Sequence, residues 1–227
     1  MSYKRYAIYA APEGALWDAA SQWLGWDAAR GAALPQPEIA DLPRPLAEIT
    51  EAPRKYGFHG TIKPPFRLAK GPSHDDLVWA AEAMCLRLSP VVLAGLRLER
   101  IGGFLALVPD GDERALSGLA AQVVEGLDAF RAPPDAAEIA RRNPDRLTPR
   151  QREYLNQWGY PHVMEEFRFH MTLTGDLPLP ESRAVAAVLD PWIAPHLPRP
   201  FAIDSLCLFG EAEDGRFHLI HRHTLTG

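Results

Sequence analysis

The chain of 227 residues is 47% apolar and 23% charged, which is typical of a globular protein large enough to bury a core. A formal net charge of −5 argues against a broad basic surface for long nucleic acid, although a small phosphorylated ligand needs only a local basic pocket. We find no signal-peptide pattern and no stretch near the roughly 18 apolar residues that span a bilayer, so no membrane partner is expected. Cys85 and Cys207 each lie in an apolar segment and are expected to be buried, reduced thiols of a cytoplasmic protein.

The first half of the chain predicts six segments, in the order strand, helix, irregular connection, strand, helix and strand. Five prolines interrupt the connection, and connections of that length often cover or form a functional site. Ser73 is the expected N-cap of the second helix. The predicted ranges are 6–10, 13–24, 31–55, 56–63, 73–88 and 91–100.

The second half predicts the same order again. A hairpin turn at Gly102-Gly103 leads into it. Its linker, at 132–160, is longer and contains a short helix for which Thr148 is the expected N-cap and Pro149 the first residue. The other segments are a strand at 103–108, a helix after the turn at 109–112, a strand at 167–174, a helix at 181–189, a strand at 201–209 and a last strand at 216–224.

Because one order of elements occurs twice, we interpret the chain as an internal duplication. The predicted fold class is α+β, a single bilobal domain over residues 1–227. The first lobe would cover about 1–102 and the second about 103–227, with terminal strands free to cross between lobes. Each lobe would hold a mostly antiparallel sheet backed by helices, and a central cleft would lie between the two sheets.

Two of the predicted strands carry one pattern, namely phenylalanine, histidine, any residue, threonine and an aliphatic residue. Alternation with a period of two places apolar side chains on one face of each strand and polar side chains on the other. The polar faces carry, in the first strand, His59, Thr61 and Lys63, and in the second, Arg168, His170, Thr172 and Thr174.

Two histidines that face each other across a cleft suit phosphodiester cleavage. One neutral imidazole takes a proton from the attacking water or hydroxyl, and the other, as imidazolium, protonates the leaving oxygen. The residue pattern does not assign these roles between His59 and His170. Thr61 and Thr172 are expected to donate to non-bridging phosphate oxygens. Neither polar face carries a carboxylate, so we expect an anionic substrate, no metal and no cofactor.

The pair His59-Gly60-Thr61 and His170-Met171-Thr172, each followed by an aliphatic residue, resembles the signature motifs of the two-histidine (2H) phosphoesterase superfamily. Residues 54–66 and 158–175 resemble more specifically the branch found with phosphonate-utilisation genes. The resemblance implies the bilobal fold, a metal-independent mechanism and the two histidines and two threonines as catalytic residues. It suggests a small phosphorylated substrate such as ribose 5-phosphate with a 1,2-cyclic phosphate, and other phosphonate-pathway enzymes as partners by pathway only.

Further substrate contacts are predicted from position alone. Lys63 and Arg168 share the polar faces and would neutralise the phosphate, although exposed strand cations are often merely solvated. Arg141 and Arg142 in the longer linker would contact a second phosphate as part of a lid, or form a solvated charge run. Tyr160 would line the pocket.

Several alternatives stay open at this point. The enzyme could be an RNA or nucleotide 2′,3′-cyclic phosphodiesterase, and a non-catalytic module that binds a phosphorylated metabolite would use the same cleft. Tyr56 shares the parity of Phe58, which favours packing. His221 and His223 lie on one strand face as a possible ligand pair, but no Cys, Asp or Glu is placed to complete a metal site. The remaining histidines outside the motifs, namely His74, His162 and His196, are expected at the surface.

Overall fold

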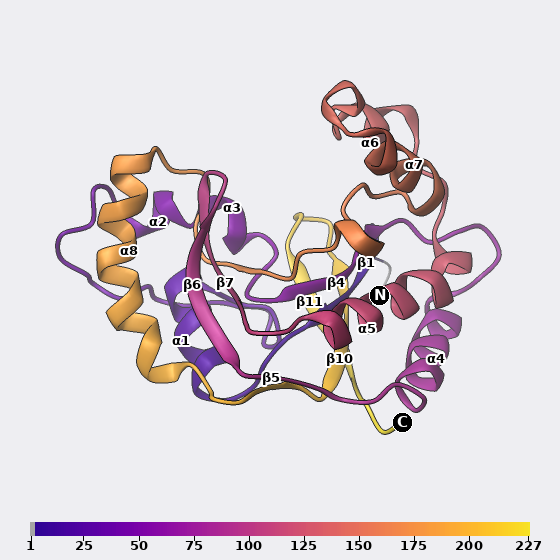
Figure 1. The fold of residues 1–227 in the computed structure, drawn as a ribbon, viewed down its shortest axis with the longest axis horizontal. Coiled ribbons are helices and arrows are strands. Elements are labelled where there is room, and N and C mark those ends of the chain that lie inside the picture. The colour runs from indigo at the N-terminus through magenta and orange to yellow at the C-terminus, as the bar shows by residue number, and fades with distance from the viewer. Residues whose placement is uncertain (1–2) are drawn as a thin grey trace.

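The computed structural model describes residues 3–227 and shows an α+β protein built on a seven-stranded antiparallel sheet (Figure 1). The strand order is β11-β10-β1-β4-β8-β7-β6. Two small sheets accompany it, β2 with β3 and β5 with β9. The strands are β1 (Arg5–Ala10), β2 (Trp26–Asp27), β3 (Ala32–Ala33), β4 (Gly60–Phe66), β5 (Val91–Leu93), β6 (Gly95–Ile101), β7 (Phe104–Asp110), β8 (Met171–Thr172), β9 (Phe201–Ile203), β10 (Ser205–Glu211) and β11 (Phe217–Thr224).

The helices gather at the two ends of this sheet. Figure 1 shows α1, α2 and α8 at one end and α4 and α5 at the other, while α6 and α7 project from the body. The helices are α1 (Ala15–Leu24), α2 (Leu46–Ile49), α3 (Glu51–Arg54), α4 (His74–Cys85), α5 (Arg114–Gly126), α6 (Ala136–Ala140), α7 (Pro149–Trp158) and α8 (Leu179–Ile193), with short 3₁₀ turns at Asp128–Phe130, Pro144–Arg146, Met164–Glu166 and Ala194–His196.

The predicted helix starts are confirmed where a side chain caps the helix. Ser73 caps α4 and Thr148 caps α7, and each accepts a hydrogen bond from the backbone N–H three residues on. In both cases the side chain at that third position returns a bond to the backbone of the capping residue, which forms a capping box. The predicted hairpin is also present, since β6 and β7 pair up to Ile101 and Phe104 around Gly102-Gly103.

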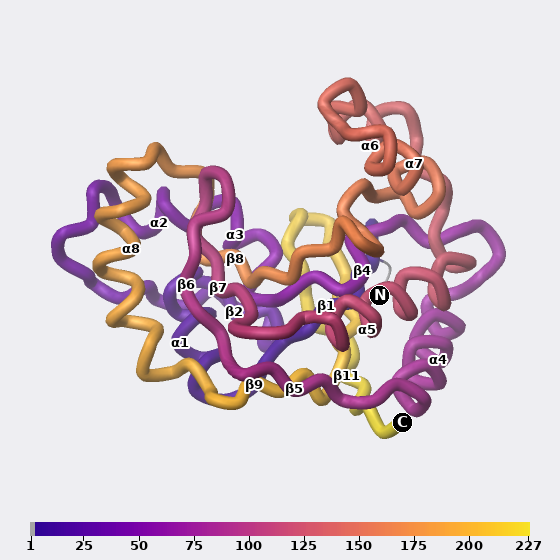
Figure 2. The backbone as a smooth tube through the Cα atoms, in the orientation of Figure 1, coloured from indigo at the N-terminus to yellow at the C-terminus, as the bar shows by residue number. Residues whose placement is uncertain are grey.

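The expectation of two separate sheets is wrong, because β4 and β8 pair and join all seven strands into one sheet. The two copies of the predicted repeat are β1-α1-β4-α4-β6 and β7-α5-β8-α8-β10. They exchange their last strands, since β6 pairs with β7 and β10 pairs with β1. The predicted boundary near 102 therefore runs through the β6–β7 hairpin, and each half of the sheet contains strands of both copies (Figure 2).

The first histidine strand starts and ends later than predicted. It runs through Pro64 and Pro65, which both lie opposite Ala7 in a bulge against β1. On its other edge β4 pairs with β8 only at Gly60. Proline removes a backbone donor and is tolerated at bulges and unpaired edges, so the two prolines do not end this strand. The second histidine strand is shorter than predicted and keeps only Met171–Thr172.

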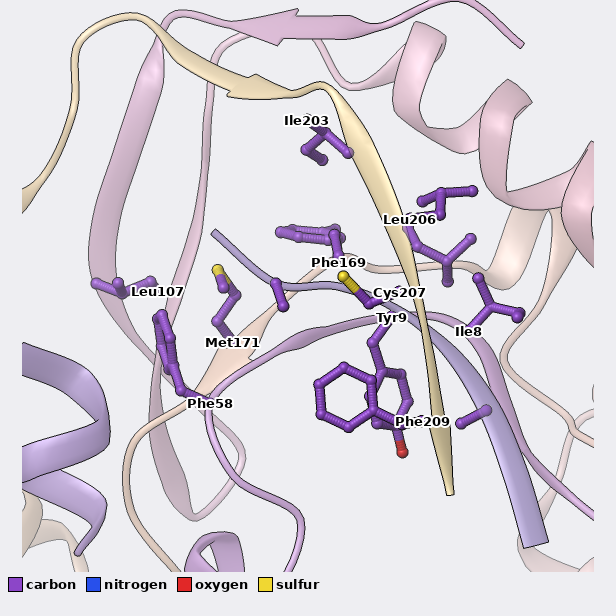
Figure 3. Close-up of a cluster of buried hydrophobic side chains, with 14 of the residues drawn as sticks. Ile8, Tyr9, Phe58, Leu107, Phe169, Met171, Ile203, Leu206, Cys207 and Phe209 are labelled. Atoms are coloured by element: carbon purple, nitrogen blue, oxygen red, sulfur yellow. The ribbon is translucent and has the colours of Figure 1, made fainter. Parts of the chain in front are cut away.

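Apolar side chains from both histidine segments enter the core. Phe58, Phe169 and Met171 are almost fully buried (Figure 3). Cys85 and Cys207 are buried free thiols, and burial raises the pKa of Cys207 to about 12. Among residues 3–227, no helix has the length and apolarity needed to cross a membrane.

Candidate active site

The two histidine motifs meet at the centre of the sheet. Gly60 pairs with Met171, so each paired residue directly follows a motif histidine. Both histidines therefore lie at the point where two chain segments enter adjacent strands. Segments far apart in the sequence are thus brought together.

Gly60 is the contact point between the motifs. A Cβ atom built on Gly60 would lie 2.1 Å from Cζ of Phe169. Only a residue without a side chain leaves room for the Phe169 ring against this backbone. The glycine of the first motif thus allows the second motif to approach closely enough to pair.

His59 is enclosed, with 8% of its surface exposed. Its ring stacks on Tyr9 at 3.5 Å between centroids, and Tyr56 packs edge-on at 5.4 Å. The Gly57 carbonyl lies 3.1 Å from Nδ1 and the Thr61 hydroxyl 3.2 Å from Nε2. A carbonyl only accepts hydrogen bonds, so Nδ1 carries the proton and Nε2 presents its lone pair towards Thr61.

Burial lowers the pKa of His59 from 6.5 to about 3. The hydrogen bond to Gly57 opposes this shift, and the charge of the nearby His170 lowers the pKa further. Since desolvation penalises the imidazolium, the His59 ring is neutral at physiological pH. A neutral ring with a free Nε2 is a proton acceptor.

His170 lies in a more open environment. Its ring is partly exposed, and the Phe104 ring lies 5.6 Å away. Nδ1 lies 2.8 Å from the Arg168 carbonyl, so it donates there and leaves Nε2 available, as in His59. The two motifs therefore orient their imidazoles in the same way but surround them differently.

Thr61 and Thr172 are both partly exposed beside the histidines. Burial raises the pKa of Tyr56, which the sequence assigned to packing, to about 12, and the nearby Thr172 side chain opposes this shift. The phenol thus stays protonated between the motifs. Tyr160 is partly exposed and close enough to Tyr56 and Tyr9 to influence both hydroxyls, which is consistent with its predicted place at the pocket.

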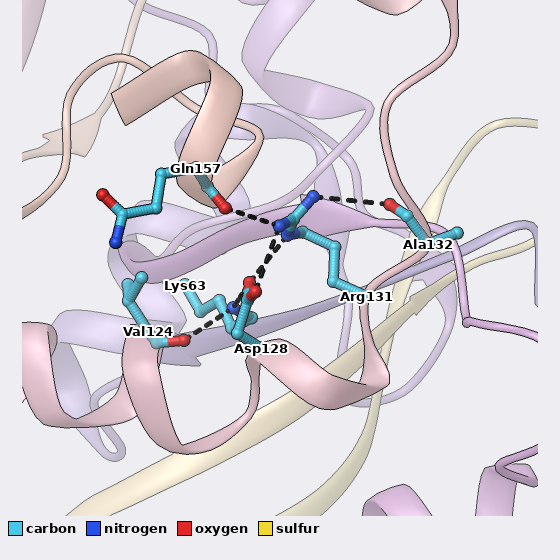
Figure 4. Close-up of polar contacts among 6 residues, drawn as sticks. All are labelled: Lys63, Val124, Asp128, Arg131, Ala132 and Gln157. Atoms are coloured by element: carbon cyan, nitrogen blue, oxygen red, sulfur yellow. Dashed lines mark hydrogen bonds and ion pairs between the residues drawn. The ribbon is translucent and has the colours of Figure 1, made fainter. Parts of the chain in front are cut away.

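Lys63 does not contact this site, contrary to the prediction from parity. Its ammonium group is 2% exposed and donates to the Val124 carbonyl at 2.9 Å, with Asp128 at 3.5 Å (Figure 4). A bulge is the cause: Thr61 pairs with Tyr9 but Lys63 pairs with Ile8. Paired residues share a face and neighbouring residues do not, so the extra residue turns Lys63 away from Thr61. Burial lowers the pKa of Lys63 to about 8, against the effect of Asp128.

Arg168 is exposed and folds back on its own segment. Its guanidinium donates to the carbonyls of Glu165 and Phe167 at 2.9 and 2.6 Å. Arg141 and Arg142 lie on the projecting segment and line a groove of about 750 Å³ that includes neither histidine. The structure therefore does not place these three arginines against the histidine rings.

Two further residues of the site were missed by the sequence analysis. Tyr9 was treated only as part of the first strand, although its pairing with Thr61 brings it under His59. His162, expected at the surface, is exposed but lies 5.8 Å from Tyr160 between ring centroids. The alternating pattern of β1 was the available signal for Tyr9, and the sequence carried no signal for His162.

The other histidine cluster is separate from the site. His74 and His221 lie 6.4 Å apart and His221 and His223 5.9 Å apart between ring centroids. Within residues 3–227, no three His, Cys, Asp or Glu side chains converge in a way that could hold a metal ion.

The fold and the paired motifs resemble those of two-histidine phosphoesterases. The crystal structure of E. coli LigT complexed with NADP+ matches the whole of this chain over its own whole length, with a TM-score of 0.50 and 15% sequence identity. At that identity the match speaks for the fold alone, and it supports the predicted α+β class with mainly antiparallel strands.

The chain belongs to the family described as "Protein of unknown function (DUF1045)", which matches residues 61–218. Two curated relatives are named "Ribose 1,5-bisphosphate phosphokinase PhnN". The one from Janthinobacterium sp. (strain Marseille) is 36% identical over 94% of this chain, and the one from Laribacter hongkongensis (strain HLHK9) is 34% identical over 93%. The chain spans about half the length of each relative, 49% in both cases.

Proposed function

We propose that the protein is a phosphoesterase that hydrolyses a cyclic phosphodiester of a small sugar phosphate or nucleotide, with His59 and His170 as base and acid. One observation carries this proposal. The carbonyls of Gly57 and Arg168 hold the two Nδ1 atoms, so both Nε2 atoms are available at the meeting point of the motifs. Two imidazoles whose Nε2 atoms lie beside hydroxyl groups can activate an attacking water and protonate the leaving oxygen, and the hydroxyls can stabilise the phosphate.

The unequal surroundings of the two histidines support one assignment of the roles. His59 is held neutral by burial and takes the proton of the attacking water on Nε2. His170 is the more exposed ring, so its imidazolium stays in contact with water. As the water oxygen bonds to phosphorus, the ester bond of the ring breaks and His170 protonates the leaving oxygen. Both histidines then return to their starting states by exchanging one proton with solvent.

Thr61 and Thr172 are the donors to the phosphate. Each follows a histidine by two residues, and both hydroxyls are partly exposed at the site. When substrate binds, they donate to the non-bridging oxygens, on which negative charge increases in the transition state.

A ribose 5-phosphate that carries a 1,2-cyclic phosphate is the substrate that fits best. The curated relatives are named for ribose 1,5-bisphosphate, although the name covers proteins twice the length of this chain. Hydrolysis of the bond between O2 and phosphorus in the cyclic compound leaves the phosphate on O1 and so yields ribose 1,5-bisphosphate. We therefore place the reaction in phosphonate metabolism, immediately before a step that consumes this bisphosphate.

A screen of cyclic phosphates tests the proposal. Ribose 5-phosphate 1,2-cyclic phosphate and nucleoside 2′,3′-cyclic phosphates are incubated with the wild type, His59→Ala and His170→Ala, and the products are identified by phosphorus NMR. We expect turnover of the ribose compound to be unaffected by EDTA and to fall about 10²- to 10⁴-fold in each variant. Full turnover in both variants, or complete loss in EDTA, contradicts the mechanism. Preference for nucleoside cyclic phosphates contradicts the substrate assignment alone.

A further inference from the structure

A large groove lies at the Arg5 end of β1, and its lining includes neither motif histidine. It has a volume of about 750 Å³ and lies between residues 132–160, which we call the arm, and the ends of β1, β4 and β10. Figure 1 shows the arm, with α6 and α7, standing above the body of the molecule. The volume is in the range of sites for small molecules. Six cationic side chains line the groove, namely Lys4, Arg5, Arg67, Arg131, Arg141 and Arg142.

Four of these cations are already paired with carboxylates, among them Lys4 with Glu213 at 3.0 Å. Arg5 pairs with Glu211, and Arg67 pairs with Glu138 at 2.9 Å. Arg131 pairs with Asp128 at 2.7 Å. Their charges are therefore largely compensated, and they form the walls of the groove rather than free binding groups.

Arg141 and Arg142 differ from these cations. No carboxylate within residues 3–227 forms an ion pair with either guanidinium, although Glu138 lies near enough to Arg141 for its pKa to be lowered slightly by that charge. Arg142 instead lies over the ring of Tyr160, 4.5 Å from its centroid. The arm thus presents two adjacent guanidinium groups to the groove without neutralising them.

Arg142 packs next to residues that lie near the motif histidines. Tyr160, which carries Arg142 on its face, lies 5.8 Å from the His162 ring. Burial lowers the pKa of His162, and the charges of both Arg142 and His170 lower it further, against the effect of Glu166. His162 is therefore near enough to both Arg142 and His170 to be affected by their charges.

The base of the arm is fixed to the sheet. Arg131 donates to the Gln157 carbonyl at 2.9 Å and to Asp128, so it joins the two ends of the arm (Figure 4). Asp128 also contacts Lys63 of β4, the strand that follows His59. Gly159 ends α7 with a φ of 72°, and its Cα faces the Arg131 side chain closely enough to exclude a Cβ. This network holds the arm in a defined position relative to the motifs.

We propose that Arg141 and Arg142 form a subsite for a second phosphate of the substrate. The substrate class is then a cyclic phosphodiester that also carries a separate phosphate monoester. This inference rests on the proposed function, because it places the cyclic phosphate at His59 and His170. Guanidinium groups bind phosphate oxygens through paired, charge-assisted hydrogen bonds, and two unpaired ones can hold a dianion.

Two substrates that differ only in the second phosphate test the subsite. The values of kcat/KM are measured for ribose 5-phosphate 1,2-cyclic phosphate and for ribose 1,2-cyclic phosphate. The compared quantity is kcat/KM for the 5-phosphate compound divided by kcat/KM for the compound without it. If the subsite exists, this ratio falls about 10- to 100-fold in the double variant Arg141→Gln/Arg142→Gln. The matched control is Arg146→Gln, which removes one exposed charge of the same arm outside the groove and leaves the ratio unchanged. An unchanged ratio in the double variant overturns the subsite and leaves the proposed function standing.

A binding measurement separates the two proposals when neither compound is hydrolysed. Ribose 5-phosphate is titrated by calorimetry into the wild type, the double variant and Arg146→Gln. Weaker binding in the double variant alone supports the subsite even though the proposed function has failed. Equal binding in all three proteins, or no binding to the wild type, overturns the subsite. Thermal melting of the double variant shows that it is folded in either case.

Discussion

The two histidine motifs are nearly identical in sequence but not in environment. His59 is 8% exposed and stacked on Tyr9, whereas His170 is partly open to solvent beside Phe104. Burial lowers the pKa of His59 to about 3. Acid–base catalysis needs one proton acceptor and one donor, so a symmetric pair of motifs becomes useful when the surroundings differ.

The difference arises outside the motifs. Tyr9 belongs to β1, which pairs with the first motif strand, and Phe104 belongs to β7, which pairs with the second. These strands occupy equivalent places in the two copies of the repeat but present different side chains. The duplication thus supplies two equivalent histidine positions, and the neighbouring strands make them chemically distinct.

After the histidine variants, replacement of the two motif threonines should give the largest loss of kcat. Thr61→Val and Thr172→Val each remove one donor to the phosphate, and kcat should fall about 10- to 100-fold in each. Thr61 also bonds His59, so its variant should shift the pH profile while Thr172→Val should not. Kinetics from pH 3 to 9 measure both quantities, since the pKa of His59 is lowered to about 3.

Thr174→Val is the control for this pair. Its hydroxyl is buried and accepts a hydrogen bond from the Leu105 N–H at 2.9 Å. We expect a loss of about 1–3 kcal/mol in the free energy of unfolding, because a buried donor is left without a partner. An equal fall of kcat in all three variants speaks against a role of Thr61 and Thr172 in binding phosphate.

Replacement of Gly60 tests the contact between the motifs. The Cβ of Gly60→Ala would meet the Phe169 ring at 2.1 Å, so the free energy of unfolding should fall by about 1–3 kcal/mol. Gly118→Ala in α5, where a Cβ meets nothing within 4 Å, should raise stability by up to about 1 kcal/mol. Urea denaturation measures both.

A double-mutant cycle with Phe169→Leu identifies the cause of this loss. If the clash destabilises Gly60→Ala, the smaller side chain at position 169 relieves part of it, and the double variant is more stable than the sum of the single effects predicts. Strict additivity contradicts the assignment.

The buried state of His59 predicts a dependence of stability on pH. The pKa of His59 in the folded protein lies below its value of 6.5 in the unfolded chain. The contribution of His59 to the free energy of unfolding is therefore complete above pH 6.5 and is lost as pH falls towards 3. Below pH 6.5 the unfolded wild type binds a proton at His59 that the folded protein does not, and His59→Gln removes this difference. The free energy of unfolding of the wild type should therefore fall by up to about 1.4 kcal/mol more per pH unit than that of the variant. Denaturation at pH 7, 5.5 and 4.5 measures the difference, and parallel curves contradict the buried neutral ring.

The sequence predicted the elements and motifs well but the surroundings of the motifs less well. The alternation of apolar side chains placed Phe58 and Phe169 in the core, and the caps at Ser73 and Thr148 are present. Alternation failed for Lys63, because one extra residue in a bulge reverses the face of every residue after it. Bulges depend on the partner strand, which a single segment does not reveal.

The sequence also could not predict that the two sheets join or that the arm forms one side of a groove. Pairing of β4 with β8 depends on one residue pair and on the space left at Gly60. The groove under the arm contains residues from β1, β4 and β10 and from the 132–160 segment, so its charge becomes apparent only after folding. Long-range contacts of this kind leave no periodic signal in the sequence.

The assignment of His59 as base and His170 as acid is tested most directly by varying the leaving group. The kcat values of the wild type, His59→Ala and His170→Ala are compared on the cyclic phosphate and on a diester with a p-nitrophenyl leaving group, which departs without a proton. We predict that the loss in His170→Ala shrinks at least about 10-fold on the nitrophenyl diester, while the loss in His59→Ala is the same on both substrates. The reverse pattern, or equal losses in both variants on both substrates, would contradict the account.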